Sequence, residues 1–100
     1  MGQCRSSGVQ TASAAIFSGQ CRLISLHGVH TGLDPNTAAT VKVFDNASAA
    51  SGTELARLVL GGPAQSAPVV MEYDMHGVLA TNGLYLEITG ATAAVSVEFN

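Results

Sequence analysis

The chain has 100 residues and a mass of 10.2 kDa, which suffices for one domain with a single modest core. Charged residues make up 11% of it and the net charge is −3, so it lacks the basic surface that binding to nucleic acid or to anionic membranes needs. We find no apolar run near the roughly 20 residues that span a bilayer, and no signal-peptide pattern.

The first residues are rich in serine, glycine, glutamine and alanine. We therefore expect residues 1–14 to form a flexible amino-terminal arm and residues 15–100 to form a single domain. Gly2 and Ser6 fit the myristoylation pattern, with Cys4 as a second acylation site, but a pattern this short often matches by chance. Cys4 and Cys21 could pair in an oxidising compartment; we favour two free thiols in a reducing cytoplasm.

After this segment, turn signals recur about every 8–12 residues, the spacing of an all-β protein. The pattern predicts a compact antiparallel β-sandwich or barrel of about 7–8 short strands. The first strand is expected within residues 20–29, and a turn at Asp34-Pro35-Asn36 follows it. In the strand predicted over 40–44, Val41 and Val43 should face inward and Lys42 should face water.

Residues 51–60 allow two interpretations. Ser51 and Glu54 form a capping-box pattern for a helix with Leu55, Leu58 and Val59 on one face. The same stretch alternates as a strand, with Ala56, Leu58 and Leu60 on one side. We favour the strand, because the neighbouring segments are β and a lone ten-residue helix is marginal.

The carboxy-terminal half continues with a loop over 61–68 and a strand over 69–73. Residues 77–81 and 84–89 are predicted to be the arms of a hairpin, because Asn82-Gly83 is the preferred pair for a type I′ turn. Leu84, Leu86 and Ile88 should then share one face. A final strand is expected where Val95, Val97 and Phe99 alternate with polar residues.

Motifs for catalysis, phosphate binding and metal binding are missing from the sequence. His27 and His30 lie three apart, which places them on opposite faces of a strand, and His76 is distant. The run from Glu72 through Asp74 to His76 is interpreted as a strand end entering a polar turn. We therefore assign no catalytic, cofactor-binding or metal-binding residues, expect no cofactor, and classify the chain as a non-enzyme.

Two segments carry a family resemblance. One runs from Val41 to Ser48 and leads into Ser51-Gly52-Thr53-Glu54-Leu55; the other runs from Gly77 to Gly90 and leads into residues 95–99. Together they resemble small virion structural proteins of tailed bacteriophages, which have a strand ending in Asp, a Ser-Gly-Thr before the next strand, and a "G…NGLY" motif before a last V-x-V-x-aromatic strand. The resemblance begins at Val41 and leaves the first 40 residues uncovered.

The resemblance implies a β-sandwich of the virion, of the capsid cement or decoration type. Such a protein would be made in the host cytoplasm, bind the outside of the head, and bridge subunits of the major capsid protein. Low charge and many small residues favour self-association, as a homo-oligomer and possibly a homotrimer. Residues 1–19 are hypothesised to order on the capsid or on a neighbouring copy.

Two alternatives remain open at this point. The chain could be a head–tail connector or a tail component, which sequence does not separate from a cement protein. It could instead be a small carbohydrate-binding module, although it has no Trp; of its aromatic residues Phe17, Phe44, Tyr73, Tyr85 and Phe99, we expect Tyr85 to be the most exposed.

Overall fold

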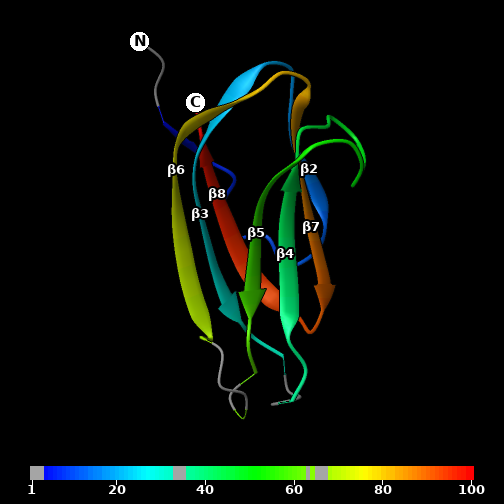
Figure 1. Ribbon diagram of the computed structural model, residues 1–100, viewed down its shortest axis with the longest axis vertical. Coiled ribbons are helices and arrows are strands. Elements are labelled where there is room, and N and C mark those ends of the chain that lie inside the picture. Colours follow the sequence, from blue (N-terminus) through cyan, green and yellow to red (C-terminus); the bar gives the residue numbers. More distant parts are fainter. Residues whose placement is uncertain (1–3, 33–35, 63, 65–67) are drawn as a thin grey trace.

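The computed structural model describes residues 4–32, 36–62, 64 and 68–100, which fold into two antiparallel sheets packed face to face (Figure 1). Over these residues each sheet has four strands, in the order β1-β8-β3-β6 in sheet A and β2-β7-β4-β5 in sheet B. The strands are β1 (Arg5–Ser6), β2 (Ala14–Ser18), β3 (Cys21–His30), β4 (Ala39–Phe44), β5 (Glu54–Leu60), β6 (Val70–Ala80), β7 (Gly83–Gly90) and β8 (Ala93–Phe99). The predicted all-β sandwich of about eight strands is confirmed.

The core lies between the sheets and consists of the alternate residues that each strand points inward. The largest fully buried side chains are Leu23, Leu26, Leu58, Leu60, Leu84, Leu86, Val41, Val43, Val95 and Val97. Burying one such side chain contributes about 1.5–3 kcal/mol. Burial of these inward-facing side chains is therefore the main interaction that holds the two sheets together. The inward and outward faces predicted for residues 41–43, 84–88 and 95–99 are confirmed.

Residues 54–60 form strand β5, as favoured from the sequence. Ala56, Leu58 and Leu60 are buried against the other sheet, while Arg57 and Val59 face outward. A helix would have placed Leu58 on the side opposite Ala56 and Leu60, whereas the strand buries all three apolar residues on one face.

The predicted hairpin at Asn82-Gly83 is wrong. Strand β6 belongs to sheet A and β7 to sheet B, so these residues carry the chain from one sheet to the other. A type I′ turn needs a positive φ at both central residues, but of the two only Gly83, at 149°, has one. A side chain at position 83 would run into the carbonyl oxygen of Phe17, so glycine is required by close packing as well.

Asp45, directly after β4, fixes this corner. Its Oδ2 accepts hydrogen bonds from Thr81 N at 3.1 Å and Thr81 Oγ1 at 3.0 Å, and its Oδ1 accepts one from Asn82 N at 2.7 Å. These bonds lower the pKa of Asp45 below 3.8, with the Asn82 backbone contributing most. A residue that follows a strand of sheet B thus anchors the connection that leaves sheet A.

Strand β6 is continuous, which corrects the expectation of two strands separated by a polar turn. Its pairing with β3 jumps from Leu23↔Val78 to Ser25↔Asp74, so β6 carries extra residues at this point. His76 and Gly77 both have positive φ, at 54° and 79°. The turn-like residues therefore form a β-bulge inside the strand rather than an end to it.

The amino-terminal segment also differs from expectation, because its described part pairs with the sandwich. Arg5 and Ser6 pair with Phe99 and Glu98 of β8, and Gln10 forms an isolated bridge with Val95. Without this segment, β8 would be an edge strand with unpaired backbone groups, and pairing satisfies them. Within the segment that we expected to form a flexible arm, residues 5–6, 10 and 14 thus have β pairing partners.

Several sequence predictions fall wholly or partly outside the described residues. These are the acylation pattern at Gly2, residues 34 and 35 of the turn at 34–36, and residues 63 and 65–67 of the loop over 61–68. Of the two cysteines, Cys4 is exposed and Cys21 is buried, and both are free thiols. Burial, followed by the charge of Asp45, raises the pKa of the Cys21 thiol.

Candidate functional site

The outer face of sheet A carries three cross-strand rows of side chains, one above another along β3. Residues that are directly opposed in an antiparallel pair share one face of the sheet. Each row has one member from β8, one from β3 and one from β6: Ala94, Val29 and Val70; Ser96, His27 and Glu72; Glu98, Ser25 and Asp74. One apolar row therefore adjoins two polar rows.

A bulge in β3 sets which residues reach this face. Leu23 pairs with Phe99 and both are buried, but the next pair is Ser25 with Glu98, which leaves Ile24 as an extra residue. The inward position passes from Leu23 to Leu26, and Ser25 and His27 turn to the outside.

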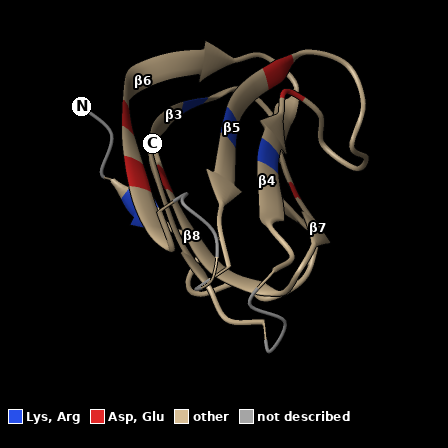
Figure 2. Ribbon diagram, turned by 60° about the horizontal axis from the view of Figure 1, so that its bottom comes forward, with Lys and Arg blue, Asp and Glu red and all other residues tan. Residues whose placement is uncertain are grey.

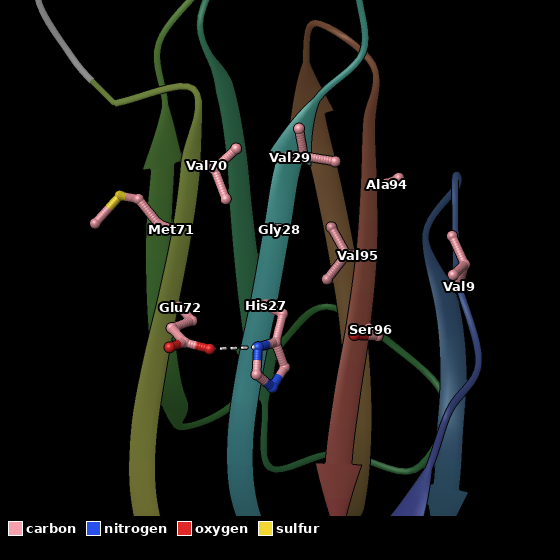
Figure 3. Close-up of a pocket in the computed structure, with 10 residues that line it drawn as sticks. All are labelled: Val9, His27, Gly28, Val29, Val70, Met71, Glu72, Ala94, Val95 and Ser96. Atoms are coloured by element: carbon pink, nitrogen blue, oxygen red, sulfur yellow. Dashed lines mark ion pairs between the residues drawn. The ribbon is translucent and has the colours of Figure 1, made fainter.

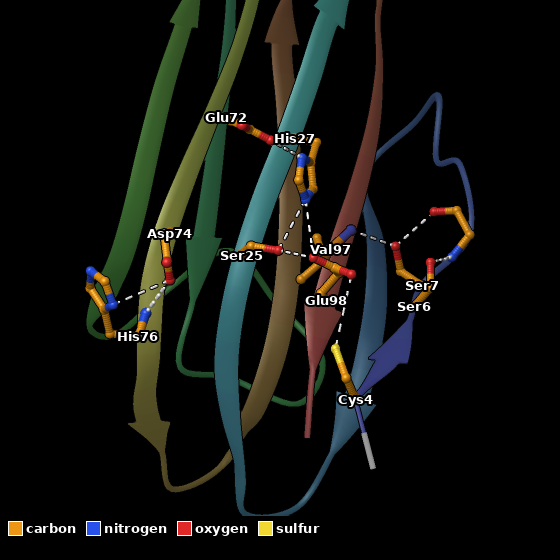
Figure 4. Close-up of polar contacts among 11 residues, drawn as sticks. Cys4, Ser6, Ser7, Ser25, His27, Glu72, Asp74, His76, Val97 and Glu98 are labelled. Carbon is orange, nitrogen blue, oxygen red and sulfur yellow. Dashed lines mark hydrogen bonds and ion pairs between the residues drawn. The ribbon is translucent and has the colours of Figure 1, made fainter.

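These outward residues form a hydrogen-bonded network centred on His27 (Figure 4). Its Nδ1 lies 2.9 Å from Glu72 Oε2, and its Nε2 lies 3.2 Å from Glu98 Oε1 and 3.0 Å from Ser25 Oγ. Ser25 Oγ donates a hydrogen bond to Glu98 Oε1. The Sγ of Cys4 lies 3.9 Å from the other oxygen of Glu98, so the amino-terminal segment reaches the network.

The hydrogen bonds lower the pKa of the Glu98 carboxyl. The bond from Ser25 is the main cause and the one from His27 is the next. Only the protonated imidazole ring can donate to Glu72 and Glu98 at once, because a neutral ring has one N–H. The network therefore holds negative charge at the surface.

The order Ser25, His27, Glu72 matches the connectivity of a serine-histidine-acid relay, but the surroundings do not suit nucleophilic attack. Ser25 is only 8% exposed and donates its proton to Glu98. The carboxylate of Glu98 lies beside the hydroxyl, where it would repel an oxyanion that develops during acyl transfer. The arrangement is better suited to ordering the sheet surface and holding charge than to catalysis.

An apolar groove adjoins this network (Figure 3). It has a volume of about 460 Å³ and is lined by side chains from β3, β6, β8 and the segment after β1. Val70 is 66% exposed, and Val9 on the opposite side of the groove is 72% exposed. Exposed aliphatic side chains that converge on a concavity mark a surface for binding, since they gain by leaving water.

Charges are distributed differently over the two sheets (Figure 2). On sheet B, Lys42 lies 3.9 Å from Glu87, and Arg57 makes two 2.8 Å hydrogen bonds to Glu54. On sheet A the acidic side chains are not paired with lysine or arginine in this way.

All four basic side chains of the chain are described, and none forms an ion pair on sheet A. Arg22 donates to the carbonyl oxygen of Gly77, and Arg5 lies over the ring of Phe17. The carboxylates of Glu72, Asp74 and Glu98 thus have histidines as their only described ion-pair partners.

The remaining histidines lie apart from this network. His30 faces the opposite side from His27, as predicted; it is buried, with Nε2 2.7 Å from Thr37 O, and its Nδ1 has no partner among the described residues. His76 lies on the bulge, with Nδ1 3.5 Å from Asp74. Within the described ranges, no three potential ligands come together to hold a metal ion.

The aromatic side chains offer no broad platform for a sugar ring. Tyr73, at 42% exposure, is the exposed aromatic residue of the described chain, whereas Tyr85, which we expected to be the most exposed, is half-buried. Phe44 and Phe99 are buried. In the described part of the chain, no helix is long and apolar enough to cross a membrane.

Comparison of the chain with protein-family models, with curated proteins and with solved structures gave no match. The functional interpretation therefore depends on the sequence patterns and on the surface of sheet A.

The sequence patterns did not reveal the network because its members come from three strands. A signal was nevertheless present: Ser25 and His27, Glu72 and Asp74, and Ser96 and Glu98 each occupy alternate positions on the outward face of a strand. Strand order and register would have been needed to place the three pairs side by side.

Proposed function

We propose that this protein is a non-enzymatic structural component of a tailed-bacteriophage virion, of the capsid decoration or cement type. In this role it binds the outside of the head, contacts the major capsid protein, and associates with copies of itself. The support from sequence is the resemblance over residues 41–99. The observation that carries the proposal is the exposed apolar groove on sheet A, which gives a small inert sandwich a surface for adhesion.

The physical demands of such a role suit this architecture. A decoration protein must bridge neighbouring subunits many times over a symmetric shell, and each contact needs only a modest interface of roughly 800 Å² per partner. Repetition then multiplies a weak individual contact. The amino-terminal segment, held to β8 by a few backbone bonds, could exchange between copies or pair with the capsid.

The test is the number of copies on purified particles, measured by quantitative mass spectrometry against the major capsid protein. We expect a number of copies near the number of capsid subunits or near the number of their local threefold axes. Copies numbering only a small fraction of the capsid subunits would overturn the decoration role and favour a connector or tail component. Absence from particles would overturn any virion role.

Self-association is tested separately by light scattering of the purified protein. A trimeric mass, free or only when bound to capsids, supports the proposed assembly. A monomer that stays monomeric in both states would refute it.

A further inference from the structure

The outer face of sheet A has two features that together limit what can bind there. The groove offers aliphatic contact through Val9, Val29 and Val70. The neighbouring rows present Glu72 at 74% side-chain exposure, Asp74 at 68% and Glu98 at 42%. A partner must therefore bring aliphatic side chains and also positive charge.

Spacing defines the shape of that partner. Val29 and His27 lie two residues apart on β3, and Ser25 lies two residues further. At about 3.4 Å per residue the three rows are about 7 Å apart, the distance between alternate side chains of an extended chain. An extended segment lying along β3 would place one aliphatic residue over the groove and the next alternate residues over Glu72 and over Asp74 with Glu98.

Other occupants fit the charge less well. Nucleic acid and anionic lipid would be repelled by the three carboxylates. The same face of a second copy carries the same negative charge. The outer face of sheet B in a second copy has its cations neutralised by Glu54 and Glu87.

We propose that the outer face of sheet A docks an extended segment of a partner protein in which an aliphatic side chain is followed, at alternate positions, by arginine or lysine. Such a segment exchanges water on Val9 and Val70 for apolar contact. It also supplies the lysine or arginine partners that Glu72 and Asp74, paired only with histidines among the described residues, do not have. The inference deepens the adhesion role proposed above, by stating the chemistry of the surface that the protein recognises. The basic groups give orientation and specificity, and the aliphatic residue gives contact area.

The probe is a blocked peptide, Ser-Val-Ser-Arg-Ser-Arg-Ser, titrated into the full-length protein at low ionic strength and followed by two-dimensional amide NMR. We expect perturbed resonances to cluster on the outward residues of β3, β6 and β8. Binding should weaken with added salt, because exposed charge pairs are screened. A peptide with Gln in place of Arg should bind more weakly, and one with Glu should not bind.

Variants with matched controls separate the two features. Glu72→Gln and Asp74→Asn should each weaken binding by about two- to fivefold, as expected for one exposed charge pair. Glu87→Gln changes the net charge equally on sheet B and should leave binding unchanged. Val70→Ser should weaken binding, whereas Val59→Ser, at an exposed site on β5, should not.

The proposal is overturned if no resonance moves at millimolar peptide, if the shifts lie on sheet B, or if the Gln peptide binds as well as the Arg peptide. Equal effects of Glu72→Gln and Glu87→Gln would also overturn it, because they would show a response to net charge alone. The amide spectrum of each variant reports whether it is folded. The number of copies on particles does not depend on this titration, so a failure of the docking chemistry is distinguishable from a failure of the virion role.

Discussion

The corner held by Asp45 offers the sharpest test of how the two sheets are joined. Replacing Asp45 with Asn removes the charge and leaves an amide N–H₂ facing donors, so at least one of the three bonds from Thr81 and Asn82 is lost. A hydrogen bond to a charged group contributes about 1.5–3 kcal/mol, and water can replace part of it at this surface, so we expect a loss of about 1–2 kcal/mol. For a 100-residue domain this corresponds to a fall in Tm of about 5–15 °C.

The pH dependence makes this prediction specific to the charge. The pKa of Asp45 in the folded protein is below its ordinary value of 3.8. A lowered folded-state pKa contributes stability that is fully present above the ordinary value and is lost as the pH falls through the folded-state pKa. The difference in Tm between wild type and Asp45→Asn should therefore be constant near neutral pH and shrink as the pH drops below 3.8.

Thermal unfolding followed by circular dichroism, from neutral pH to the most acid pH at which the protein stays folded, measures this difference. Glu87→Gln is the control, because it removes the same charge but only a 3.9 Å ion pair, for an expected loss below about 1 kcal/mol. A Tm difference for Asp45→Asn that is absent, or that stays constant through acid pH, would show that the carboxylate does not hold the corner.

Two further predictions concern backbone packing and thiol accessibility. Gly90→Ala should lower the unfolding free energy by about 1–3 kcal/mol more than Gly8→Ala. Both sites have positive φ, but only at Gly90 would the new methyl group displace a hydrogen-bonded carbonyl group, that of Ala38. Equal losses of unfolding free energy in chemical denaturation would contradict this. A thiol reagent should label the exposed Cys4 in the native protein, as measured in the Cys21→Ser variant. It should label the buried Cys21, whose thiol pKa is raised, only after unfolding, as measured in the Cys4→Ser variant. Equally rapid labelling of the two native variants would refute the assigned burial.

Local patterns predicted β3, β4, β5, β7 and β8 well because each of these strands has one buried face. Alternation alone placed Val41 and Val43 inside. At Leu58 and Leu60 it left strand and helix open, and the β neighbours and the short length of the segment decided for the strand. The same patterns do not encode which strands pair. Asn82-Gly83 has the local chemistry of a hairpin, yet Asp45, 36 residues away from Thr81, holds it as a connection between sheets.

Composition gave no sign of the β pairing in the amino-terminal segment. Ser6 and Gln10 bury little apolar surface, which predicts flexibility, but the free edge of β8 supplies backbone partners that do not depend on side chains. Pairing of this kind leaves little signal in composition. The network on sheet A also left little signal in the sequence, because the bulge at Ile24 interrupts the alternation and turns Ser25 to the outer face.

The contrast between the sheets links this packing to function. On sheet B the outward charges neutralise each other through Lys42–Glu87 and Glu54–Arg57, so that surface has little electrostatic preference for any partner. On sheet A the bulge in β3 turns Ser25 and His27 to the surface, where the carboxylates of β6 and β8 have histidines as their described counter-ions, next to exposed valines. Since a fold of this size gains its stability from its core, the proposed docking role can use the unbalanced charge on this outer face. Reversing Glu72 and Asp74 to lysine should therefore invert peptide preference toward acidic sequences while the buried core stays intact.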